Sequence, residues 1–209
     1  MLGSAWDFDR IVEEVFKPIY KVIVEQALRR SGVSKPRVCL DLGSGTAAIA
    51  RELARILEEP LIVCLDKSPE MTSVAKYRVY LEKLDSRIEL VVGVAEKMPF
   101  RSNCIDLIVS RGSIFFWDDI EGGLRESYRV LRRNGACYVG GGFGSKELRE
   151  TVLRRLSRIK PEAEKHIRDR ERMFSLLEGM FREFSLKTNC CFKKIFRDES
   201  GFWMLFKKM

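Results

Sequence analysis

Five short apolar runs alternate with helical patterns through the first two thirds of the chain, and this alternation limits the possible folds more than any other feature. The runs are RVCLDL (37–42), LIVCLD (61–66), RIELVVG (87–93), CIDLIVS (104–110) and ACYVGGG (136–142). Such runs are typical of strands buried on both faces of a parallel sheet. Apolar residues at helical spacing lie between them, over 46–58, 69–84 and 120–131. The pattern predicts an α/β fold with helices on both faces of a mostly parallel sheet.

The two ends of the chain extend this pattern. Residues 1–34 predict two N-terminal helices, separated at Pro18, of which the second ends at Gly32. Residues 145–183 predict a long helical insertion interrupted by Pro161. The runs 185–196 and 201–208 predict two strands joined by a turn at RDES, and therefore an antiparallel C-terminal hairpin. We expect a single domain over 1–209 with a Rossmann-like, seven-stranded sheet.

Composition restricts the class of protein. No apolar run approaches the roughly 20 residues that span a bilayer, and the first residues are acidic where a signal peptide would be basic, so we expect a cytoplasmic protein. The six cysteines form no CxxC pair, and His166 lies in the charged segment EKHIRDR, so we expect no metal site. The cysteines are expected in strand cores, with a thiol site at Cys190 and Cys191 as the alternative.

Charge is unevenly distributed along the chain. Residues 1–120 carry 17 basic and 18 acidic side chains, whereas residues 121–209 carry 21 basic and 12 acidic ones, which together make the net charge of +8. We interpret the basic half as a solvated helical surface. A nucleic acid or an anionic substrate is the alternative partner.

A glycine-rich turn after the first run carries the chemistry. Gly43 and Gly45 let the backbone turn tightly and approach a ligand, and the helix start beyond them exposes N–H groups. The letters Gly43–Ala48 also fit GxGxxA, a dinucleotide fingerprint. However, Asp41 would repel a pyrophosphate and would attract an ammonium group. Asp66, which ends the second run, is placed to bind ribose hydroxyls or to cap the next helix. The predicted ligand is a nucleoside joined to an amino acid.

These residues resemble the class I S-adenosylmethionine (SAM)-dependent methyltransferases, in particular the small-molecule branch that includes ubiquinone and menaquinone biosynthesis enzymes. Residues 41–45 are similar to the first motif of the family and Asp66 to its ribose-binding acid. Residues 93–100, 106–110 and 131–136 resemble the adenine segment, the fourth strand and the turn before the fifth. The resemblance covers about residues 37–144.

The resemblance implies SAM as cofactor, S-adenosylhomocysteine as product, and in-line methyl transfer to an unidentified small molecule. It implies a cofactor site formed by Asp41, Gly43, Ser44, Gly45, Asp66, Lys67, Met71, Val94, Ala95, Glu96, Ser110, Arg111 and Tyr20. No catalytic base is predicted, because His166 is expected on a solvated helix.

Two positions depart from the family pattern. Ala47 replaces its third glycine, a change that we expect to be tolerated. Val94 replaces the acid that binds the adenine amino group, and the lost hydrogen bond predicts SAM binding weaker by about 1 kcal/mol.

The acceptor side is predicted from the end of the fourth strand. Phe115, Phe116 and Trp117 are expected to form a wall of the acceptor pocket, with core packing as the alternative. Arg111 would orient an anionic group or make a surface ion pair. Tyr20 would close over the methionine end of SAM or simply pack, and residues 145–183 would cover the acceptor side.

Three other functions are alternatives to a small-molecule methyltransferase. An RNA methyltransferase agrees with the basic half, but SRGS stands where amino-methylating nucleic-acid enzymes carry [DNS]PP[YFW]. A nicotinamide oxidoreductase is disfavoured by Asp41. A SAM-binding protein without turnover stays open, since binding motifs do not report catalysis.

Overall fold

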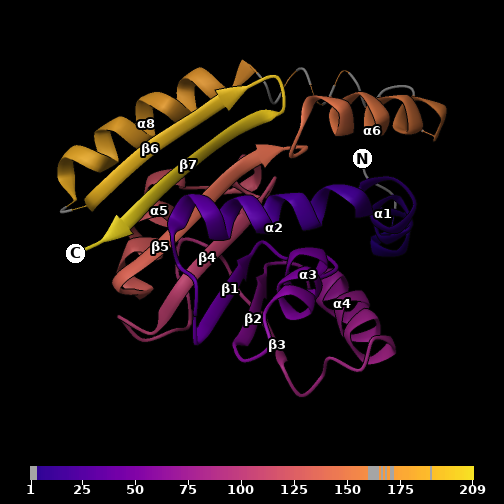
Figure 1. The fold of residues 1–209 in the computed structure, drawn as a ribbon, viewed down its shortest axis with the longest axis horizontal. Helices are drawn as coiled ribbons and strands as arrows, with labels where there is room; N and C mark the ends of the chain where they lie inside the picture. Colours follow the sequence, from indigo (N-terminus) through magenta and orange to yellow (C-terminus); the bar gives the residue numbers. More distant parts are fainter. Residues whose placement is uncertain (1–3, 160–164, 166, 168, 170–171, 189) are drawn as a thin grey trace.

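A single seven-stranded sheet forms the centre of the computed structural model, which describes residues 4–159, 165, 167, 169, 172–188 and 190–209 (Figure 1). Within these residues the strand order is β3-β2-β1-β4-β5-β7-β6. The first five strands run parallel, whereas β7 is antiparallel to both β5 and β6. The strands are β1 Val38–Leu42, β2 Leu61–Asp66, β3 Ile88–Val92, β4 Ile105–Arg111, β5 Leu131–Gly142, β6 Cys190–Asp198 and β7 Gly201–Lys208. The predicted Rossmann-like sheet and its antiparallel C-terminal hairpin are confirmed.

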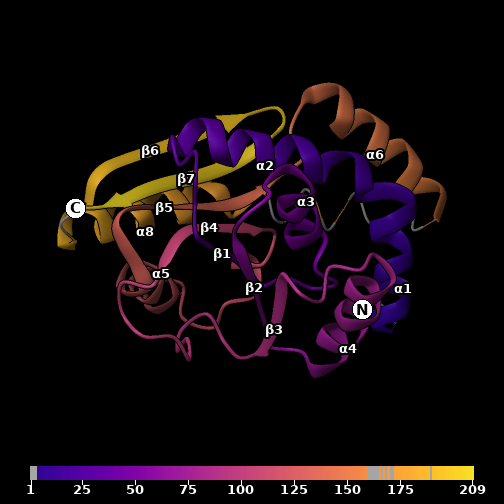
Figure 2. The same cartoon turned by 60° about the horizontal axis from the view of Figure 1, so that its bottom comes forward.

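Helices cover both faces of this sheet, as predicted (Figures 1 and 2). One apolar cluster joins the sheet to α2, α3 and α4, and a second cluster joins the opposite face to α5 and α8. Neighbouring residues of β1 divide between the clusters, Cys39 in the first and Leu40 in the second, as the two-residue period of a strand requires. The α-helices are α1 Ala5–Ile11, α2 Lys17–Ser31, α3 Ala48–Ile56, α4 Pro69–Leu81, α5 Ile120–Val130, α6 Lys146–Ile159 and α8 Phe174–Lys187.

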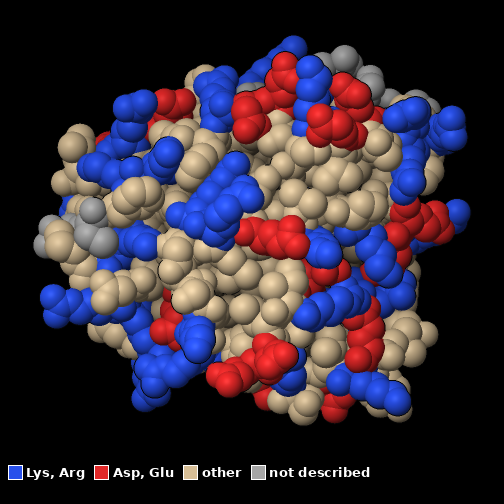
Figure 3. Space-filling model, in the orientation of Figure 1, with Lys and Arg blue, Asp and Glu red and all other residues tan. Residues whose placement is uncertain are grey.

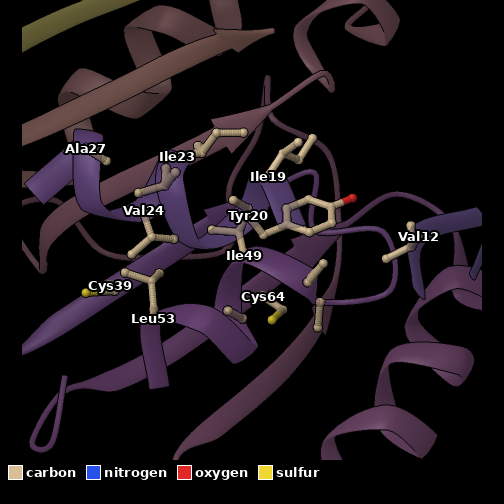
Figure 4. Packing of buried hydrophobic residues seen from close by; sticks show 14 of the residues in the cluster. Val12, Ile19, Tyr20, Ile23, Val24, Ala27, Cys39, Ile49, Leu53 and Cys64 are labelled. Atoms are coloured by element: carbon tan, nitrogen blue, oxygen red, sulfur yellow. The ribbon is translucent and has the colours of Figure 1, made fainter. Parts of the chain in front are cut away.

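The first cluster is built from aliphatic side chains of two helices and the sheet. Figure 4 shows Ile23 and Val24 of α2 facing Leu53 of α3, with Cys39 of β1 beside them. All four side chains are inaccessible to solvent. Burying each of the larger ones stabilises the fold by about 1.5–3 kcal/mol relative to leaving it exposed. This packing holds α2 against α3, and α2 also contacts β5 and β7.

The predicted break at Pro18 is wrong. A π-helical segment, η1 (Val12–Phe16), connects α1 to α2 without leaving the helical conformation. Pro18 lies in the first turn of α2, where the missing N–H group costs least. The end of α2 agrees with the prediction, because Gly32 adopts a left-handed φ of 66° and its N–H bonds to Leu28 O at 2.9 Å.

The segment between β5 and β6 also differs from the prediction. Residues 146–159 form α6, which lies beside η1 (Figure 2), whereas α8 packs against α5 and β6. The strand predicted from residue 185 begins at Cys190, because α8 continues to Lys187. Phe184 explains the extension, since it is buried against the Phe206 ring at 5.2 Å between centroids. Pro161 and His166 lie outside the described residues.

Two boundaries in the parallel part of the sheet also differ from the prediction. β5 begins at Leu131, directly after α5, rather than at 136, and α3 begins at Ala48 rather than at 46.

No helix in the described part of the chain is long and apolar enough to cross a membrane. Cys39, Cys64 and Cys137 are buried in the strands, in agreement with the core interpretation.

Candidate functional site

A cavity of about 340 Å³ lies at the carboxyl ends of the parallel strands. It is bounded by the glycine-rich turn after β1, by the end of β2, and by the segments that follow β3, β4 and β5. In open α/β sheets, ligands bind outside this edge. The volume lies within the range of small-molecule sites.

The glycine-rich turn is clamped to its neighbours on two sides. The Gly43 and Ser44 N–H groups donate to Leu65 O at 2.7 and 3.1 Å, and Ser113 Oγ donates to Leu42 O at 3.0 Å. Gly43 has a φ of 71°, and a Cβ atom there would lie 2.1 Å from Ser113 Cβ. Gly45 also has a positive φ, of 52°. Both predicted glycines line the cavity, whereas Ser44 does not.

Asp66 lies at the end of β2 with its carboxylate at the turn. Its Oδ2 accepts from Gly45 N at 2.7 Å, and its Oδ1 accepts from Ser68 N at 2.9 Å. A carboxylate offers about four acceptor positions, so these two bonds leave room for ligand hydroxyls. Asp66 lines the cavity, as a ribose-binding residue must.

Asp41 has a different environment from the one expected. It is only 2% exposed and does not line the cavity, and its Oδ2 accepts from Ala50 N at 3.0 Å. Ala47, the N-cap residue of α3, provides no side-chain cap. Asp41 therefore supplies the missing acceptor from the neighbouring strand. Burial raises the pKa of this carboxyl to about 7, and the nearby Asp66 adds to the effect, although the Ala50 bond and Arg51 oppose it. Its predicted contact with the cofactor ammonium stays a prediction.

The expected adenine segment lines the cavity with Val94, Ala95 and Glu96. Glu96 Oε1 accepts from the N–H groups of Asp118 and Asp119, at 2.7 and 3.3 Å, which ties this segment to the start of α5. Val94 stands where the family has the adenine-binding acid, and its side chain is 39% exposed.

Further predicted residues that line the cavity follow β2 and β4. Lys67 and Met71 line the cavity, and Lys67 Nζ donates to Phe116 O at 2.9 Å. Phe115, Phe116 and Trp117 also line it, and their predicted contact with an acceptor stays a prediction. Trp117 Nε1 donates to Ser113 Oγ at 3.2 Å, which fixes the indole ring at the cavity edge.

The side chain of Ser110 lies behind the residues that line the cavity. Ser110 is fully buried, and its Oγ lies 2.6 Å from Ser113 Oγ. It does not line the cavity, whereas Arg111, the next residue, does. Of the two residues predicted to bind the cofactor, only Arg111 is therefore placed at the cavity, and its contact with a ligand stays a prediction.

Tyr20 does not line the cavity either. It is 6% exposed and packs among the aliphatic side chains of the first cluster (Figure 4). The N-terminal helices instead place Phe8 and Phe16 at the cavity, and both residues were missed. They are eight positions apart, which in a regular α-helix turns side chains about 80° away from each other. The π-helical turn of η1 accommodates one extra residue, so the two rings are spaced like positions i and i+7 of a regular helix.

Other lining residues come from later segments. Ile167 and Phe174 lie in the segment 145–183 that was expected to cover the acceptor side, whereas the lining residues not predicted from the sequence are Gly141, Gly142, Phe143 and Gly201. The glycine run at the end of β5 was read only as part of a strand. Its function could have been suspected, because glycine weakens a strand unless something approaches it closely.

Comparison with known proteins agrees with the fold and the cavity. A family described as a methyltransferase domain matches residues 40–139. A solved structure from Methanococcus maripaludis, assigned as an S-adenosylmethionine-dependent methyltransferase, is 34% identical with a TM-score of 0.89. The match covers 98% of this chain and 92% of that chain. The chain belongs to the SAM-dependent methyltransferases.

Relatives of known name share only part of their length with this chain. The 2-methyl-6-phytyl-1,4-hydroquinone methyltransferase of Arabidopsis thaliana is 34% identical over 118 residues, which are 56% of this chain and 34% of the relative. The demethylmenaquinone methyltransferase of Chlorobaculum tepidum is 29% identical over 57% of this chain and 47% of its own length. The chain thus spans between about a third and a half of these relatives.

Proposed function

We propose that this protein transfers a methyl group from SAM to a small, ring-bearing acceptor of the quinol type. The observation that carries the proposal is one cavity with two kinds of wall. Gly43, Gly45 and Asp66 form a polar wall suited to a nucleoside, and Phe115 and Trp117 form an aromatic wall suited to a flat ring. The names of the partial relatives support the quinol class.

Each wall has a separate task in this reaction. Bound SAM would supply a methyl group that is already activated, so the protein chiefly aligns the acceptor and excludes water. Asp66 would accept hydrogen bonds from the ribose hydroxyls, and the backbone near Ala95 and Glu96 would bind the adenine. The aromatic wall would hold the acceptor ring in line with the methyl–sulfur bond.

The segment between β5 and β6 is proposed as the cover of the acceptor side. Two of its residues, Ile167 and Phe174, line the cavity. Phe174 also packs against the Phe202 ring of β7, at 5.2 Å between centroids. One end of the cover would therefore be anchored on the sheet.

The distribution of charge supports a small molecule rather than RNA as acceptor. Figure 3 shows Lys and Arg spread over the visible face with acidic side chains between them. Several basic side chains of the second half are paired, for example Arg129 with Glu126 and Arg132 with Asp106. A cytoplasmic location is part of the same proposal, and cell fractionation with a specific antibody tests it.

Calorimetry tests the cofactor half of the proposal. S-adenosylhomocysteine should bind the wild-type protein, and Asp66→Ala should weaken binding at least tenfold, because two ribose hydroxyls lose their acceptor. Asp85→Ala is the matched control, since Asp85 is exposed in the turn before β3, at the opposite edge of the sheet. Absence of any heat with the wild-type protein would refute the proposal.

Labelled methyl transfer tests the acceptor half. With methyl-labelled SAM, label should enter chemically reduced 1,4-naphthoquinone but not unmodified tRNA. Transfer of the label to tRNA alone would contradict the quinol proposal and would identify RNA as the acceptor. Binding of S-adenosylhomocysteine without transfer to a broad panel of small molecules would favour a protein that binds the cofactor without turnover.

A further inference from the structure

Arg111 differs from Arg51 and Arg78, two other arginines with little exposure to solvent, because both of those form ion pairs. Arg51 pairs with Glu13 and Glu82, and Arg78 pairs with Asp9. No carboxylate of the described residues lies within ion-pair distance of Arg111, although this side chain lines the cavity. Its positive charge therefore faces the ligand space without an acidic partner from the described part of the chain.

Aromatic rings and one carbonyl hold the Arg111 side chain in place. Its guanidinium lies over the rings of Phe16, Tyr20 and Phe143, at 4.7, 5.6 and 5.9 Å from their centroids. Nε donates to Gly142 O at 3.1 Å. A guanidinium has five N–H donors, so this bond leaves donors for a ligand.

This environment favours an anion. Burial lowers the pKa of Arg111, but a guanidinium stays protonated in proteins. Cation–π contacts attract the guanidinium to the ring faces and do not neutralise its charge. An anion would gain in this poorly solvated position, and a carboxylate fits the planar donor fork with two parallel hydrogen bonds.

The acidic side chains that line the cavity lie on other segments than Arg111. Asp66 ends β2 and Glu96 follows β3, with Lys67 beside Asp66 and bonded to Phe116 O, whereas Arg111 ends β4 on the side of β5. Apolar rings, among them Phe115 and Phe174, line the same cavity. A ligand that spans it would place hydroxyl or amino groups near the acids and a negative group near Arg111.

We infer that Arg111 is the receptor for a carboxylate group of a molecule bound in this cavity. Two molecules could bring that group: the amino-acid end of the cofactor, or an acidic ring-bearing acceptor. The first source rests on the proposed function, and the second does not. In both, Arg111 binds through its fork, while Phe16, Tyr20 and Gly142 keep the fork oriented.

Two pairs of probes distinguish the sources by calorimetry. S-adenosylhomocysteine and 5′-methylthioadenosine differ by the amino-acid end. 2-Naphthoate and 2-naphthamide are flat molecules of equal size that differ by the charge. Each pair is titrated into the wild-type protein, Arg111→Met, Arg111→Lys and the control Arg30→Met. Arg30 is also held by aromatic rings, at 4.2 Å from the Phe196 centroid, but it does not line the cavity.

If the cofactor supplies the carboxylate, Arg111→Met should weaken the binding of S-adenosylhomocysteine at least tenfold and leave the binding of 5′-methylthioadenosine unchanged. If the acceptor supplies it, the wild-type protein should prefer 2-naphthoate at least tenfold, and Arg111→Met should abolish that preference. Arg111→Lys keeps the charge but loses the fork, so its effect should be intermediate. Arg30→Met should behave as the wild type.

The inference is overturned if Arg111→Met, folded by circular dichroism, changes neither ratio. It is also overturned if the wild-type protein discriminates within neither pair, a result that needs no variant. Failure of the proposed function has a different signature, because neither adenosine probe would then bind. The naphthalene pair, titrated without cofactor, would still decide the role of Arg111.

Discussion

Replacing Asp41 with asparagine separates the structural role of this residue from its predicted role toward the cofactor. The carboxyl group is buried and caps α3 through Ala50 N, and its pKa is raised to about 7. In the unfolded chain an aspartate has a pKa of about 3.9. A difference of about three pH units corresponds to about 4 kcal/mol that the folded state loses when the carboxyl ionises.

The sign follows from proton binding. Between pH 4 and 7 the folded protein keeps the Asp41 proton while the unfolded chain releases it, so the free energy of unfolding falls as the pH rises. Asp41→Asn removes this dependence and keeps an oxygen acceptor for Ala50 N. Its new amide N–H groups have no obvious partner, at a cost of about 1–3 kcal/mol. We therefore expect the variant to be more stable than the wild type by about 2 kcal/mol at pH 8.5, and less stable by about 1 kcal/mol at pH 4.5.

Urea unfolding of both proteins at pH 4.5 and 8.5, followed by circular dichroism, measures this change. Asp41→Ala serves as the control for the cap. It should share the altered pH dependence of Asp41→Asn, but its free energy of unfolding should be about 1 kcal/mol lower than that of Asp41→Asn, because Ala50 N then has no acceptor. A stability difference between Asp41→Asn and the wild type that is equal at the two pH values would refute the reasoning. A loss of S-adenosylhomocysteine binding in a stable Asp41→Asn protein would support the predicted contact with the ammonium group.

Two further substitutions test the site. Val94→Asp should tighten S-adenosylhomocysteine binding by about 1 kcal/mol, roughly fivefold, because it restores an acceptor for the adenine amino group. Val92→Asp, at a position 51% exposed in β3, should leave this binding unchanged. Calorimetry that shows equal effects of the two substitutions would contradict the adenine placement. Gly43→Ala should lower the free energy of unfolding by about 2–5 kcal/mol, since the new Cβ meets Ser113 and the positive φ adds strain. Gly112→Ala, with a φ of 75° and no atom within 4 Å of the new Cβ, should cost only about 1–2 kcal/mol in the same urea titration, and equal losses would exclude the clash.

The strands were predictable because each carries its own evidence. A run such as LIVCLD is too short for a buried helix and too apolar for a loop, and it became β2, Leu61–Asp66. The hairpin at the end was predictable from the polar joint between two apolar runs. The boundaries of α8 and β6 were not, because the burial of Phe184 against Phe206 extends the helix and depends on tertiary packing.

The cavity was only partly predictable, for a related reason. Motif positions such as Gly43, Asp66 and Arg111 line it, because strand ends bring them to one edge of the sheet. Tyr20 was proposed from the family resemblance, and Phe8 and Phe16 were not considered. One extra residue in a π-helical turn changes which aromatic residues face inward, and no local pattern announces that residue.

The position of β7 has a consequence for how the protein is made. This strand lies between β5 and β6, so the sheet stays divided until the segment 201–208 has been synthesised. A nascent chain that ends after β6 would leave the edge of β5 unpaired, together with the surface that Trp203 and Phe206 later cover. Closing the sheet joins distant parts of the sequence and is therefore slow. Ribosome-bound intermediates of this protein should accordingly be good chaperone clients until β7 emerges from the exit tunnel.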